Sequence, residues 1–200
     1  MNKPVAPENS ARTRRTPILP NAVMGMLIFV VVEVMTFAGF ISAFSIAKAQ
    51  YDVWPPPNQP RLPVGMTAFN TVALIASGVL LYWAGKKFAE SQKSAQLWIL
   101  LSVLLGSLFV LFQGYEWVQL LGEGLTMQSS QYGSFFYMIV GVHALHAIAA
   151  IAILGVLYLR GLKGTLTADV LWAGQIFWYF VVGIWPVLYL LVYDPFGLGG

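Results

Sequence analysis

The sequence contains no cysteine and only two histidines among its 200 residues. The absence of cysteine excludes disulfides, thiolate nucleophiles and metal or iron–sulfur sites with cysteine ligands. Charged residues make up 10% of the chain, against about 25% in an average soluble domain. Much of the surface therefore cannot face water, and the 58% hydrophobic content indicates a polytopic membrane protein.

Several catalytic and binding motifs are also absent from the sequence. The chain has no phosphate-binding glycine loop, no nucleophile triad and no basic patch of the nucleic-acid-binding type. We therefore expect no nucleic acid partner and no catalytic residues within this chain.

Five apolar segments are long enough to cross a bilayer, which takes about 20 residues. We place them at residues 22–47, 64–85, 97–121, 132–160 and 170–193. Residues 1–20 are expected to form a cytoplasmic N-terminal tail, and residues 21–195 a single transmembrane domain. The predicted fold class is an all-α membrane protein, a bundle of five transmembrane helices.

The basic residues are distributed asymmetrically between the two sides of these segments. Nine of the eleven lysines and arginines fall on one side, and only Lys48 and Arg61 fall on the other. The nine are Lys3, Arg12, Arg14, Arg15, Lys86, Lys87, Lys93, Arg160 and Lys163. The positive-inside rule therefore places the N-terminus in the cytoplasm and the C-terminus outside.

Four ionisable side chains lie within the apolar segments. Glu33 is near the middle of the first segment, His143 and His146 are near the middle of the fourth, and Glu116 lies in the outer third of the third. Such groups are costly in a membrane and usually functional. Each is either a hydrogen-bonded structural group or a site that takes up and releases protons, because burial disfavours the charged form of a carboxyl group.

The two histidines do not form a haem site. A b-type haem is held between ligands on opposite faces, whereas His143 and His146 lie on one helix, about 60° apart around its axis and ~4.5 Å apart along it. We expect no metal and no cofactor in this chain. A zinc site built from the histidines, Glu33 and Glu116 remains an alternative.

Three tryptophans are expected to pack at interfaces. Trp54 belongs to a proline-rich external loop and is expected at the level of the lipid headgroups. Trp178 and Trp185 are seven residues apart and share one face of the last helix, which suits packing against a neighbouring helix or lipid chains.

Five motifs, in this order, resemble subunit III of the haem-copper respiratory oxidases, and of cytochrome c oxidase in particular. The resemblance runs from about residue 24 to 193. The motifs are Gly25-Met26 with Glu33; Trp54-Pro55-Pro56; Asn70-Thr71 with Ala76-Ser77-Gly78-Val79; Gln113 with Tyr115-Glu116; and Tyr132-Gly133-Ser134-x-Phe136 with Gly141-x-His143-x-Leu145-His146.

The resemblance implies a subunit without redox cofactors, which supports the assembly, stability and proton uptake of a complex that couples oxygen reduction to proton pumping. It implies direct contact with subunit I, together with subunit II and other subunits, and haem and copper in those partners. It also implies phospholipids bound between the helices. The five spans resemble shorter bacterial members, which implies a multi-pass protein of the bacterial inner membrane with a periplasmic C-terminus.

The last helix departs from the family pattern Trp-His-Phe-Val-Asp. Tyr179 and Val182 stand where the family has histidine and aspartate. Three alternatives therefore remain: an accessory protein of a quinol oxidase or nitric oxide reductase, a stand-alone proton-coupled transporter, and a membrane metalloenzyme.

Overall fold

The computed structural model describes residues 19–57 and 59–194, so most of the expected N-terminal tail lies outside the described residues. Five long helices follow one another: α1 (Asn21–Lys48), α2 (Val64–Glu90), α3 (Gln92–Gly122), α4 (Gln131–Leu162) and α5 (Ala168–Leu188). A short π-helix, η1 (Tyr189–Tyr193), continues α5. All five are long and apolar enough to cross a membrane, and no strand occurs in this part of the chain. The predicted five-helix bundle is confirmed.

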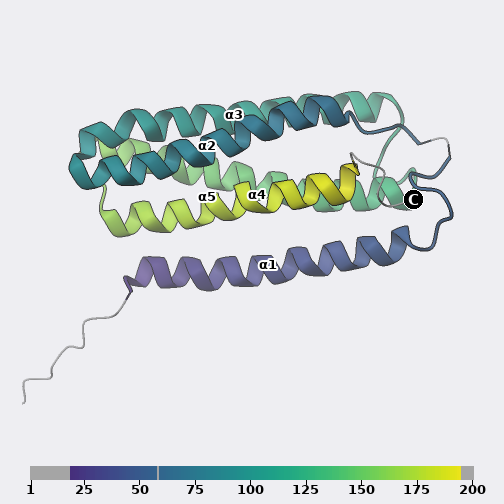
Figure 1. Ribbon diagram of the computed structural model, residues 1–200, viewed down its shortest axis with the longest axis horizontal. Coiled ribbons are helices and arrows are strands. Elements are labelled where there is room, and N and C mark those ends of the chain that lie inside the picture. The colour runs from purple at the N-terminus through teal and green to yellow at the C-terminus, as the bar shows by residue number, and fades with distance from the viewer. Residues whose placement is uncertain (1–18, 58, 195–200) are drawn as a thin grey trace, which may run out of the picture.

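The helices lie side by side along the long axis of the molecule (Figure 1). Only Ser91 separates α2 from α3, which forces these two helices to run antiparallel and in contact. α5 contacts α1, α2 and α4, and Figure 1 shows it between α1 and the α2–α3 pair. α1 lies at the edge of the bundle and is the least buried of the five spans.

Glycines end two of the helices by the same hydrogen-bonding pattern. Gly124 follows α3 with φ of 88°, and Gly164 follows α4 with φ of 70°. In each case the next residue donates its N–H to a carbonyl five residues earlier: Leu125 to Leu120, and Thr165 to Arg160, both at 2.9 Å. This is the Schellman motif, which satisfies the last carbonyls of a helix and favours glycine because of the positive φ.

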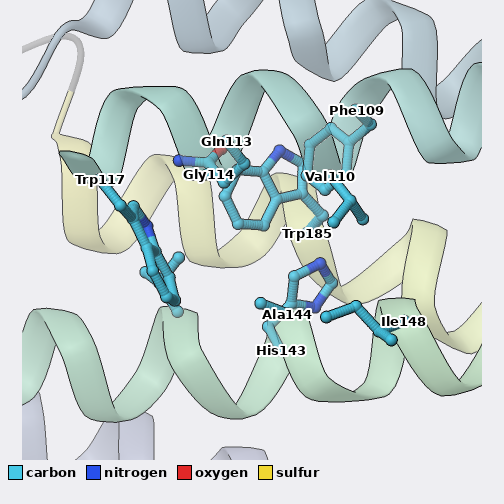
Figure 2. A pocket seen from close by; sticks show the side chains of 10 residues that line it. Phe109, Val110, Gln113, Gly114, Trp117, His143, Ala144, Ile148 and Trp185 are labelled. Carbon is cyan, nitrogen blue, oxygen red and sulfur yellow. The ribbon is translucent and has the colours of Figure 1, made fainter. Parts of the chain in front are cut away.

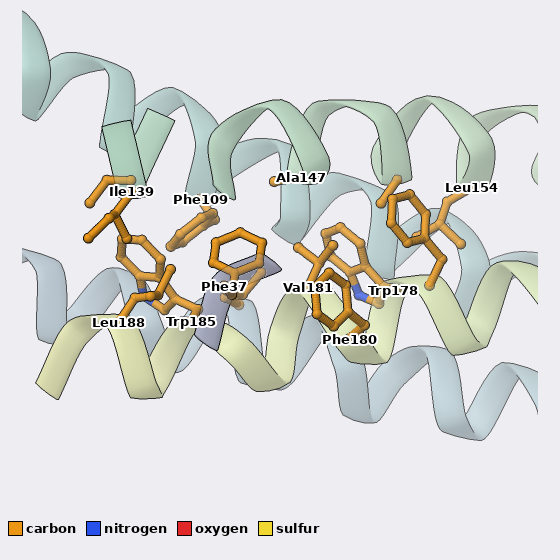
Figure 3. Packing of buried hydrophobic residues seen from close by; sticks show 14 of the residues in the cluster. Phe37, Phe109, Ile139, Ala147, Leu154, Trp178, Phe180, Val181, Trp185 and Leu188 are labelled. Atoms are coloured by element: carbon orange, nitrogen blue, oxygen red, sulfur yellow. The ribbon is translucent and has the colours of Figure 1, made fainter. Parts of the chain in front are cut away.

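Large aromatic side chains of α5 fill the centre of the bundle (Figure 3). Trp178 and Trp185 are both fully buried. α3 approaches Trp178 so closely that a Cβ atom at Gly106 would lie 2.7 Å from the indole ring. Ser102, one turn earlier on α3, donates a hydrogen bond of 2.9 Å to the carbonyl of Ser77 on α2. Small residues therefore allow α3 to approach both α5 and α2, as is usual where helices pack within lipid.

Candidate functional site

Glu33 and His146 form a pair that joins α1 to α4. Oε2 of Glu33 lies 3.1 Å from Nε2 of His146, and the two side chains are 16% and 14% exposed. Because α1 has few other contacts with α4, this pair is the main polar link between them among the described residues. The sequence placed both residues at mid-membrane depth, and the structure brings them together.

The second ring nitrogen of His146 determines how protons are arranged in this pair. Nδ1 lies 2.8 Å from the carbonyl oxygen of Val142. A carbonyl only accepts hydrogen bonds, so Nδ1 must carry a proton. Nε2 then either accepts a proton from a neutral glutamic acid or donates one to a glutamate. Glu33 and His146 therefore share one proton, and the pair is neutral overall in both forms.

His143 faces a different part of the bundle. It is 1% exposed and stacks on Trp185, with ring centroids 4.9 Å apart and planes inclined by 29°. Figure 2 shows its imidazole beside that indole. Neither ring nitrogen has a hydrogen-bond partner among the described residues.

Phe37 of α1 contacts both imidazole rings. Its ring centroid lies 6.4 Å from that of His143 and 5.7 Å from that of His146, in edge-on geometry. The two histidines therefore do not converge on one point. His146 points to Glu33, and His143 points to α5.

Glu116 is the centre of a third polar group, near the outer end of the bundle. Its Oε2 accepts hydrogen bonds from Thr67 Oγ1 at 2.9 Å and from Gln113 Nε2 at 3.0 Å. Gln113 also donates to the hydroxyl of Tyr193, at 2.9 Å. Glu116 thus joins α2 to α3, and Gln113 extends the network to η1. The arrangement can hold a buried carboxyl group and brings the end of the last span into the same network.

The three tryptophans occupy two environments. Trp54 contacts Phe44, Tyr51 and Tyr132 edge-on, with centroids 5.3–5.6 Å apart, which attaches the external loop to α1 and α4. Trp178 and Trp185 face neighbouring helices rather than lipid (Figure 3).

Several buried polar residues were missed as site residues when the sequence was read alone. Asn70 donates to the carbonyl of Phe109 at 3.0 Å, and Gln175 donates to that of Leu81 at 2.8 Å. Thr67 supplies one of the hydrogen bonds to Glu116. An uncharged amide within an apolar span is a signal that could have identified Asn70 and Gln175. A threonine gives no such signal, because its hydroxyl can bond to its own helix.

In residues 19–57 and 59–194, no group of three or more His, Asp or Glu side chains is placed to hold a metal ion. The polar groups instead form two separate hydrogen-bonded sites and one stacked histidine. Chemically, the Glu33–His146 pair can transfer its shared proton between two heavy atoms. The Glu116 network ties α2, α3 and η1 together.

Comparisons with known proteins agree with this arrangement. The family model described as cytochrome c oxidase subunit III matches residues 3–195. The chain is 32% identical to cytochrome c oxidase subunit 3 of Loxodonta africana over 200 residues, which cover 94% of this chain and 76% of the relative. It is 33% identical to the protein of the same name from Felis catus over 197 residues, which cover 93% of this chain and 74% of the relative.

Proposed function

Since this chain belongs to the cytochrome c oxidase subunit III family, we propose that it supports the assembly, stability and proton uptake of the catalytic subunit of a respiratory haem-copper oxidase. Membership of the family makes the chain a multi-pass membrane subunit of an oxidoreductase complex. We further propose that the complex is of the cytochrome c oxidase type, reduces oxygen and contains its haem and copper in other subunits.

The Glu33–His146 pair supports the role in proton uptake. It lies at mid-membrane depth and contains one shared proton between atoms 3.1 Å apart. Because the pair is neutral in both of its forms, the proton can move between Glu33 and His146 without a net charge being created in the membrane, where such a charge is expensive.

The position of α1 supports the role in assembly. α1 is the least buried span, and its outer surface carries large apolar side chains such as Val31 and Met35, which are 60% and 70% exposed. This surface is available to subunit I, which we propose as the direct partner, and to phospholipids. Subunit II belongs to the same proposed complex.

Substitutions of Glu33 test both roles in the complete complex. Glu33→Gln keeps a side chain that can donate a hydrogen bond to Nε2 of His146 but cannot give up a proton to it. We expect this variant to assemble with normal haem bands and to show slower proton uptake during turnover. Glu33→Ala removes the link between α1 and α4, and we expect less of this chain to co-purify with the haem-containing subunits.

Glu90→Gln is the matched control, because Glu90 lies at the exposed end of α2. It should change neither measurement. Normal proton uptake in Glu33→Gln would contradict the proton role. A fully assembled Glu33→Ala complex with altered haem bands would contradict the assembly role. Mass spectrometry of the intact complex identifies the partner subunits, and thereby distinguishes the proposed complex from a quinol oxidase or nitric oxide reductase.

We also propose a location in the bacterial inner membrane with the N-terminus in the cytoplasm, as the distribution of basic residues indicates. The absence of cysteine makes this testable by single-cysteine labelling. A membrane-impermeant thiol reagent added from outside intact spheroplasts should label Gln128→Cys, between α3 and α4, and not Ser94→Cys, near the start of α3. The reverse pattern would show the opposite orientation.

A further inference from the structure

A cavity of about 120 Å³ lies between α3, α4 and α5. Trp117 and Gln113 of α3, His143 of α4 and Trp185 of α5 are among the residues that line it. Figure 2 shows the Trp117 indole at one end of this region and His143 with Ile148 at the other. The cavity is distinct from the Glu33–His146 pair, because neither Glu33 nor His146 lines it.

Three of the lining side chains carry polar atoms that no protein group satisfies. Both ring nitrogens of His143, Nε1 of Trp117 and Oε1 of Gln113 are buried and have no hydrogen-bond partner in the described part of the chain. A buried polar atom left without a partner costs about 1–3 kcal/mol. Native proteins rarely tolerate several such atoms together. Their concentration around one cavity therefore points to a bound molecule that hydrogen-bonds to them.

The unpartnered atoms are two donors and two acceptors. Trp117 contributes one N–H, and a neutral imidazole contributes one N–H and one acceptor nitrogen. The carbonyl oxygen of Gln113 is the second acceptor. A molecule that both donates and accepts matches this set, and a lipid chain or another apolar guest does not. A water molecule occupies about 30 Å³ of liquid, so the cavity has room for a small cluster.

We propose that this cavity binds a cluster of ordered water molecules that connects His143 with Gln113 and Trp117. Gln113 already donates one hydrogen bond to Glu116 and another to Tyr193. The bound water extends this network from the outer end of the bundle to the depth of His143. The otherwise apolar bundle thereby contains a continuous polar column along α3.

High-resolution cryo-electron microscopy of the intact complex tests this assignment. In the wild type, we expect separate density peaks within about 2.7–3.2 Å of a His143 ring nitrogen, Trp117 Nε1 or Gln113 Oε1. Trp117→Phe keeps an aromatic side chain and removes the indole N–H, so the peak next to residue 117 should be lost. His143→Phe should remove the peaks next to residue 143 in the same way.

Trp178→Phe is the matched control. Trp178 is fully buried and its Nε1 is also unpartnered among the described residues, but it does not line this cavity. We expect the peaks to be unchanged in that variant. Xenon under pressure is a second probe, because dry apolar cavities of similar size bind it. The wild type should bind no xenon here, and the Trp117→Phe/His143→Phe double variant should bind it.

Three results would overturn the assignment. One is continuous density entering from the lipid, which identifies an acyl chain. Another is a xenon peak in the wild type, which identifies a dry cavity. The third is a map that resolves water elsewhere in the complex and has no peak in this cavity.

Discussion

Replacing Gly106 with alanine tests the close packing of α3 against α5. A Cβ atom at this position would lie 2.7 Å from Cη2 and 2.8 Å from Cζ2 of Trp178. Carbon atoms ordinarily approach to about 3.5–4.0 Å, so the indole or the helix must shift by about 1 Å. Trp178 is rigid and fully buried, so it has no free space on another side. Overpacking of this kind typically costs about 1–3 kcal/mol.

Gly114→Ala on the same helix is the matched control. A Cβ atom at Gly114 meets no heavy atom within 4 Å. Any change in helix propensity from glycine to alanine applies to both variants, so their difference isolates the contact with Trp178. For a chain of this size, 1 kcal/mol corresponds to about 2–4 °C in the midpoint of thermal unfolding, so we expect Gly106→Ala to unfold about 2–12 °C below Gly114→Ala.

The assay heats the detergent-solubilised complex and follows the loss of this chain from it by size-exclusion chromatography. The same midpoint for the two variants would refute the packing argument. A lower midpoint for Gly114→Ala than for Gly106→Ala would refute it as well.

Two further substitutions test the core and an interhelical hydrogen bond in the same assay. Phe37→Ala opens a cavity beside both histidines, and we expect a loss of about 2 kcal/mol, because the helices stay in the membrane when they separate and only the packing loss counts. Phe69→Ala, at a side chain that is 76% exposed, should have little effect, and equal losses would contradict the burial of Phe37. Gln175→Leu removes the bond of 2.8 Å to the carbonyl of Leu81 and should cost about 0.5–1.5 kcal/mol; an unchanged midpoint would show that this bond contributes nothing.

The positions of the candidate site residues along the membrane normal were predictable, and their partners were not. Glu33, His143 and His146 were all expected near mid-membrane depth. Spacing alone did not indicate that Glu33 pairs with His146 rather than with His143. That choice depends on how α4 is rotated about its own axis, which places His146 toward α1 and His143 toward Trp185.

The Glu116 network shows the same limit. The sequence indicated a buried acid in the outer third of the third span. Its donors come from Thr67 on α2 and from Gln113, which also contacts Tyr193 of η1. The last of these contacts spans 80 residues of sequence, so only the packed bundle brings its members together.

The sequence by itself determined the five spans and the depth of each polar group within them. The physical reason is that lipid satisfies no backbone hydrogen bond, so each crossing must be an apolar helix of about 20 residues. Only the tertiary structure decided which face of each helix points inward. On α2, Leu74 is fully buried whereas Phe69 is 76% exposed. Both faces of such a helix are apolar because lipid and core are equally so, and hydropathy therefore does not distinguish them. Close contacts such as that of Gly106 with Trp178 set the rotation instead.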